Sequence, residues 1–78
     1  MKIYDTENKR VLSNVTLFLS PLELLELAKS ANDLAQNIKK HHHHINDSDF
    51  ANEITIAVYT AENLNTFDEE SRKVIVGS

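Results

Sequence analysis

The segment SPLELLELAKSANDLAQNIKK, residues 20–40, decides the fold of this 78-residue chain, because it carries its clearest structural signal. Ser20 is a good N-cap, since its hydroxyl can accept a hydrogen bond from an unpaired backbone N–H of the first helical turn. Pro21 fits the first helical position, and Glu23 completes a capping box with Ser20. Apolar residues then recur at spacings of three and four and form one stripe: Leu24, Leu27, Ala28, Ala31, Leu34, Ala35 and Ile38. The sequence therefore predicts a helix from Pro21 to about Lys40 that covers a core.

Strands are predicted on both sides of this helix, because apolar and polar residues alternate there. Residues 1–4 and 10–19 are expected to form a hairpin around a polar connection at residues 5–8. Residues 53–60 are expected to form a further strand after a turn at residues 46–49. The alternation places these side chains on the core face of the second strand: Val11, Val15, Leu17 and Leu19. The alternation also places three side chains on one face of the third strand: Ile54, Ile56 and Val58.

The C-terminal part repeats the capping pattern in Thr66-Phe67-Asp68-Glu69, which predicts a short helix through Arg72 or Lys73. Residues 74–76 fit either this helix or a final strand. We interpret Gly77-Ser78 as a cloning remnant, which leaves one α+β domain over residues 1–76. The expected fold is a ββαβ core: a β-hairpin, one long helix packed on one sheet face, a third strand, and a short C-terminal helix or strand. Parallel neighbouring strands around the long helix would require a right-handed crossover.

The composition narrows the classes of function. The chain has no Cys, which excludes disulfides and thiol nucleophiles and fits a reducing, cytoplasmic location. A formal net charge of -4 argues against binding of long nucleic acid, and no apolar run approaches the roughly 18 residues of a membrane span. A core of this size contributes about 3–5 kcal/mol. Because open strand edges favour self-association, we expect a homo-oligomer.

A histidine run is the main chemical feature of the sequence. It follows two lysines directly, so six potential hydrogen-bond donors occupy six consecutive positions on an otherwise acidic chain. Such a patch predicts a site for a small anion, with an aromatic side chain nearby as a stacking surface. The candidate ligand-binding residues are Lys39, Lys40, His41, His42, His43, His44 and Tyr59.

The same run has other interpretations. It can be a polar junction in which imidazoles lie near the negative end of a helix dipole, or a cloning tag. It can also bind metal, since an extended run places His42 and His44 on one side. Zinc needs three or four ligands, so Asp47 or Asp49, or a symmetry mate, would have to complete the site. No resident cofactor is expected.

Catalytic motifs are missing from the sequence. It contains no nucleophile elbow and no carboxylate dyad, and with 1 Gly it has no glycine-rich phosphate loop. We therefore expect a binding protein rather than an enzyme.

Residues 15–59 resemble the Imm32-like group of small bacterial immunity proteins. The resemblance rests on Leu17-Phe18-Leu19, on Ser20-Pro21-Leu22-Glu23-Leu24, on His42-x-His44-x-x-Asp47, and on the strand from Ile54 to Val58. It implies a non-catalytic inhibitor that neutralises a toxin by binding it.

In size and acidity the chain is also similar to small phage counter-defence proteins, among them sponges that sequester nucleotide signals. We expect a protein that sequesters or inhibits a partner, foremost an anionic small ligand such as a nucleotide signal. An immunity protein that binds a toxin and a His-based metal-binding module are the alternatives.

Overall fold

The computed structural model describes residues 1–77, so the interpretation of Ser78 as a remnant lies outside the described residues. The chain divides into two compact units, and each is described by itself. Residues 18–59 form the helix–hairpin unit, and residues 1–17 together with those from Thr60 onward form the terminal unit.

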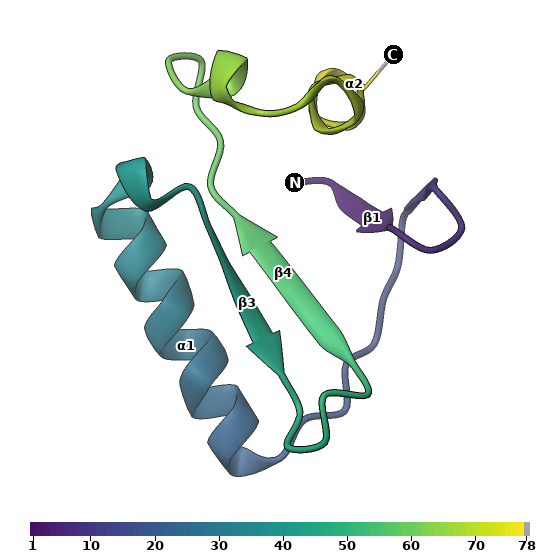
Figure 1. Cartoon of the computed structure of the whole chain (residues 1–78), viewed down its shortest axis with the longest axis vertical. Coiled ribbons are helices and arrows are strands. Elements are labelled where there is room, and N and C mark those ends of the chain that lie inside the picture. Colours follow the sequence, from purple (N-terminus) through teal and green to yellow (C-terminus); the bar gives the residue numbers. More distant parts are fainter. Residues whose placement is uncertain (78) are drawn as a thin grey trace. The chain divides into compact units, whose positions relative to one another are not determined.

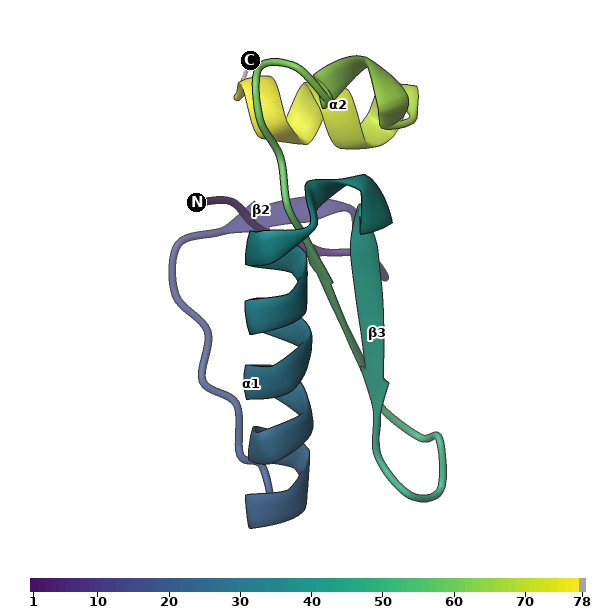
Figure 2. The same cartoon turned by 90° about the vertical axis from the view of Figure 1, so that its left-hand side faces the viewer.

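The helix–hairpin unit consists of one long helix and one β-hairpin. Its elements are α1 (Pro21–Gln36), a 3₁₀ turn η1 (Ile38–Lys40), β3 (His42–Asn46) and β4 (Glu53–Ala57). β3 and β4 are antiparallel, with His42 opposite Ala57 and Ile45 opposite Ile54. The helix contacts β3 and lies along the hairpin in both views (Figures 1 and 2). The prediction of one long helix on one face of a sheet is therefore correct for this unit.

α1 begins where the sequence predicts and ends earlier. The Ser20 hydroxyl accepts from the N–H of Glu23 at 3.2 Å, and the Glu23 carboxylate accepts from the N–H of Ser20 at 2.8 Å. The predicted end near Lys40 is wrong, because the helix closes at Asn37, whose N–H donates to the carbonyl of Asp33 at 2.9 Å. Asn competes with helical backbone through its own side chain, and helix ends commonly tighten into 3₁₀ turns.

The core of this unit is small. Leu34 of α1 is 3% exposed and Ile45 of β3 is 5% exposed, while Leu27 and Ile38 are half-buried. Leu24 and the alanines of the predicted stripe remain exposed, so only part of that stripe covers the sheet. Residues paired across an antiparallel ladder share a face. The face that contains Ile45 therefore also contains His43, Ile54 and Ile56.

The terminal unit combines a short hairpin with a helix. β1 (Ile3–Asp5) pairs antiparallel with β2 (Arg10–Leu12), and η2 (Leu64–Thr66) precedes α2 (Glu69–Val76). The predicted hairpin connection is correct, since Asp5 Oδ1 accepts from the N–H groups of Glu7 and Asn8 at 3.1 and 3.2 Å. Within this unit, the Tyr4 hydroxyl donates to Glu70 of α2 at 2.7 Å.

α2 differs from the prediction at both ends. Its N-cap is Asp68, whose carboxylate accepts from the N–H of Ser71 at 2.8 Å, whereas Thr66 lies in η2. The helix continues through Val76, so the last residues are helical and not a strand. Gly77 ends it with φ 77° and ψ 34°, the left-handed conformation that glycine adopts without steric cost.

The second strand is the main error of the sequence-based fold. Residues 13–19 have no regular structure and, within the described chain, form no backbone–backbone hydrogen bond. Val11, Val15 and Leu17 are exposed rather than in the core. The reason is that β1 is three residues long, so its ladder ends at the pair Ile3–Leu12 and leaves the following residues without a partner strand.

The expected ββαβ arrangement is consequently replaced by two separate hairpins. The described residues contain two two-stranded antiparallel sheets, and neither has the parallel neighbours that a right-handed crossover needs. The structure is an α+β protein, as predicted, with a different strand arrangement. None of the helices in residues 1–77 combines the length and apolar character required to cross a bilayer.

Candidate functional site

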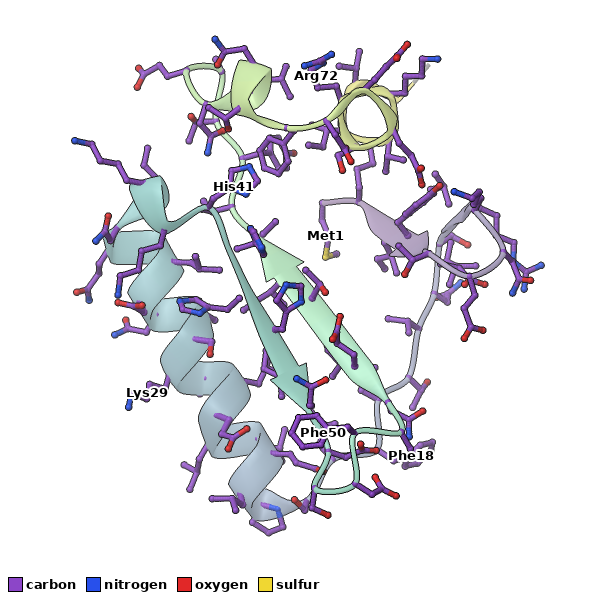
Figure 3. All side chains as sticks on the ribbon, viewed as in Figure 1. Met1, Phe18, Lys29, His41, Phe50 and Arg72 are labelled. Carbon is purple, nitrogen blue, oxygen red and sulfur yellow. The ribbon has the colours of Figure 1, made fainter. Side chains whose placement is uncertain are left out.

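The histidine run forms most of a strand that the sequence analysis did not predict. Three of the five residues of β3 are His42, His43 and His44. His41 precedes them with φ 73° and ψ -57°, close to a γ-turn, and this residue redirects the chain from η1 into the hairpin (Figure 3). Its carbonyl accepts from the N–H of Val58 at 3.1 Å. The imidazoles of β3 are therefore divided between the two faces of a strand.

On the helix side of β3, the carboxylate of Asp33 accepts hydrogen bonds from two of the predicted ligand-binding side chains. Lys40 Nζ lies 2.8 Å from Asp33 Oδ2, and His43 Nε2 lies 3.0 Å from the same oxygen. The hydrogen bond from Lys40, followed by that from His43, lowers the pKa of Asp33 below its ordinary value. The carboxylate is thus ionised at neutral pH and holds both donors in place.

A groove of about 590 Å³ opens between α1 and β3 around this carboxylate. Ligand pockets of proteins typically have volumes of about 300–1,000 Å³. The groove is lined by Glu26, Lys29, Ser30, Asn32, Asp33, Gln36, Lys40, His43, His44 and Ile45. Three of the seven predicted ligand-binding residues are therefore brought together, whereas Lys39, His41, His42 and Tyr59 are not part of this lining.

Sequence reasoning missed the contribution of the helix to this groove. Glu26, Lys29, Asp33 and Gln36 lie three or four positions apart, which is the spacing of neighbours on one face of a helix. That polar stripe is the signal that the sequence contains for the groove. Two lysines and two carboxylates in the lining balance each other in charge, so the groove is polar rather than uniformly basic.

The outer face of the hairpin presents a second group of side chains. The rings of His42 and His44 have their centroids 5.0 Å apart with an interplanar angle of 79°. His44 Nδ1 lies 2.8 Å from the Thr55 hydroxyl and 3.2 Å from Glu53 Oε1. His42 Nδ1 lies 2.9 Å from His41 Nδ1. Both imidazoles are exposed and are held through their Nδ1 atoms.

Asp47, the predicted third metal ligand, has a structural role in the β3–β4 turn. Its two carboxylate oxygens accept from the backbone N–H of Asn52 at 3.0 Å and from the Asn52 side-chain amide at 2.9 Å. These hydrogen bonds lower the pKa of Asp47. Over residues 1–77, no three or more His, Asp or Glu side chains are grouped so as to hold a metal ion. The trio of His42, His44 and Asp47 is therefore not assembled.

Comparison of the chain with protein-family models, with curated proteins and with solved structures found no significant match.

Proposed function

We propose that this protein is a non-catalytic binding protein that sequesters an anionic small ligand, such as a nucleotide, in the groove between α1 and β3. The groove itself is the observation that supports the proposal, because its volume of about 590 Å³ suits a ligand of that size. Four nitrogen-bearing side chains that can contact an anion line it: Lys29, Lys40, His43 and His44.

Lys29 is the best-placed contact for a phosphate group. It forms no ion pair with any described residue, so its ammonium group is available to a ligand. Lys40 and His43 are oriented by Asp33, which reduces the conformational entropy that they lose on binding. The remaining polar side chains of the lining, from Ser30, Asn32 and Gln36, supply hydrogen bonds to a base or sugar.

The acidic side chains of the groove restrict the size of the ligand. Glu26 and Asp33 repel a long polyanion but tolerate one phosphate group matched to one or two cations. This argument supports a mononucleotide or a small cyclic nucleotide over nucleic acid. Storage of the ligand rather than its chemical conversion is part of the proposal, because the sequence contains no nucleophile elbow and no glycine-rich phosphate loop.

A thermal-shift titration with inorganic phosphate, mononucleotides and cyclic dinucleotides tests this proposal. The expected result is a rise in melting temperature with at least one nucleotide, because a ligand that binds only the folded state stabilises it. Lys29→Ala should weaken that ligand at least tenfold, whereas Lys39→Ala, a neighbouring exposed lysine outside the lining, should not. The proposal is wrong if no nucleotide at millimolar concentration shifts the transition, or if both lysine variants weaken binding equally.

A toxin-binding immunity protein is the second candidate, and exposed aromatic residues favour it. Phe18 is 93% exposed and Phe50 is 78% exposed in the helix–hairpin unit (Figure 3). Aromatic side chains of this kind anchor protein–protein interfaces. If Phe18→Ser and Phe50→Ser abolish protection from a cognate toxin in cells while nucleotide binding is absent, this function replaces the first.

A further inference from the structure

We infer that the outer face of the β3–β4 hairpin is half of a transition-metal site, which is completed when the same face of a second copy supplies two more imidazoles. The ligands are His42 and His44 of each copy, and the ion is a divalent metal with affinity for imidazole, such as Zn²⁺. The site shares His44 with the lining of the groove between α1 and β3, but the inference does not rest on the function proposed for that groove.

The ring geometry of the pair suits a shared ion. Zinc binds imidazole nitrogen at about 2.0–2.1 Å with tetrahedral angles, which places the centroids of two bound rings about 5 Å apart. The centroids of His42 and His44 are separated by 5.0 Å before any ion is added. The two rings are therefore already separated by the distance that a shared ion requires.

The hydrogen bonds of His42 and His44 involve Nδ1 of each ring and leave Nε2 for the metal. A zinc-bound histidine usually donates its second ring N–H to a carboxylate or another oxygen, and this contact fixes the tautomer and orientation of the ring. His44 has such partners for Nδ1 in Thr55 at 2.8 Å and Glu53 at 3.2 Å. His42 Nδ1 contacts His41 Nδ1. In His44, Nε2 is therefore the metal-binding atom, and His42 presents the same atom when its Nδ1–H donates to His41.

The surroundings of the pair allow a second copy to approach. His42 lies opposite Ala57 and His44 lies opposite Thr55, so each imidazole faces a shorter side chain across the ladder. All four residues are exposed. Each imidazole therefore extends further from the sheet than the side chain paired with it. An ion bound to the same face of a second copy can reach the imidazoles without contact between the strands.

One chain cannot complete the site by itself. Zinc needs three or four protein ligands, and the described residues of one chain offer no third one at this face. Glu53 is engaged with His44 Nδ1, and Asp47 is engaged with Asn52. Two copies related by a two-fold axis supply four nitrogens, two from His42 and two from His44, and four is the coordination number that zinc prefers.

The test combines zinc titration calorimetry with sedimentation analysis at neutral pH. The expected result is one Zn²⁺ for every two chains, together with zinc-dependent dimerisation, or tightening of an existing dimer, that a chelator reverses. Cobalt(II) should show the intense visible absorption of tetrahedral coordination in the same 1:2 ratio. One ion per monomer, or no binding at high micromolar zinc, would overturn the inference.

Histidine variants distinguish this site from the general affinity of a histidine run for metals. His42→Ala and His44→Ala should each abolish the 1:2 complex, whereas His43→Ala, which removes a neighbouring imidazole on the opposite face, should retain it. If His43→Ala proves unfolded by circular dichroism, Lys39→Ala is the substitute control. Glu53→Gln should lower zinc affinity roughly 10- to 100-fold with unchanged stoichiometry, as expected for a residue that positions a ligand. Equal losses in His43→Ala and His44→Ala would also refute the site.

Discussion

Truncation of Leu34 tests whether α1 covers the hairpin with the face seen in the structure. Leu34 is 3% exposed, and Leu34→Ala removes three carbon atoms from the contact between α1 and β3. At about 0.8 kcal/mol for each buried methylene, the transfer term alone is about 2.4 kcal/mol. Measured Leu→Ala changes at buried sites extend from about 2.7 to 5.0 kcal/mol, because a cavity adds to the transfer term. We expect about 2.5–3 kcal/mol, since so small a core can partly collapse around the missing side chain.

Leu25→Ala is the matched control, because it makes the same chemical change in the same helix. Leu25 is 68% exposed, and alanine is a slightly better helix former than leucine. The free energy of unfolding should therefore change by less than about 0.5 kcal/mol.

Urea denaturation followed by far-UV circular dichroism measures both variants at one protein concentration. With a denaturant slope near 1 kcal/mol/M for a chain of this size, Leu34→Ala should lower the urea midpoint by about 2.5–3 M, and Leu25→Ala by less than about 0.5 M. A larger loss for Leu25→Ala than for Leu34→Ala would refute the packing of α1, because it would show that the opposite side of the helix is buried in the protein.

Two further substitutions examine the start of α1 and the carboxylate of the groove. Ser20→Ala should lower the free energy of unfolding by about 1 kcal/mol in urea denaturation, because the first turn loses its N-cap, while Ser48→Ala in the exposed turn should be nearly neutral. Asp33→Asn should destabilise the protein at neutral pH. Because Lys40 and His43 lower the pKa of Asp33 in the folded state, its stabilising contribution is complete above the unfolded pKa of about 3.9 and is lost as the pH falls through the lower folded value. The urea midpoints of wild type and Asp33→Asn should thus converge as the pH falls through the folded pKa of Asp33, and a gap that persists in acid would contradict the assigned contact.

Local signals in the sequence were sufficient where one short segment determines the geometry. The start of α1 depends on hydrogen bonds between Ser20 and Glu23, which are three residues apart and therefore meet in any context that allows a helix. The turn at Asp5 follows the same principle, since its carboxylate binds the backbone of the next residues. The alternation of β4 predicts its faces correctly, because Ile54 and Ile56 are half-buried and Thr55 is exposed.

The candidate site was predictable only in part. The histidine run identified Lys40, His43 and His44, which line the groove, but not their distribution over two faces, which depends on the pairing of β3 with β4. The contact between His43 and Asp33 joins residues ten positions apart on different elements. No periodicity within the run could indicate it, since it arises only when α1 packs on β3.

The sequence by itself determined the start of α1, the apolar alternation of β4 and the absence of thiol chemistry, because each depends on composition or on neighbours within one helical turn or strand. The tertiary structure alone decided that residues 13–19 do not form a strand and that the histidines do. A segment forms a strand only when a second strand pairs with its backbone N–H and C=O groups. The presence of a partner strand therefore decides whether the segment is a strand. β4 pairs with His42, His43 and His44, whereas β1 is too short to pair with any residue of the second strand beyond Leu12.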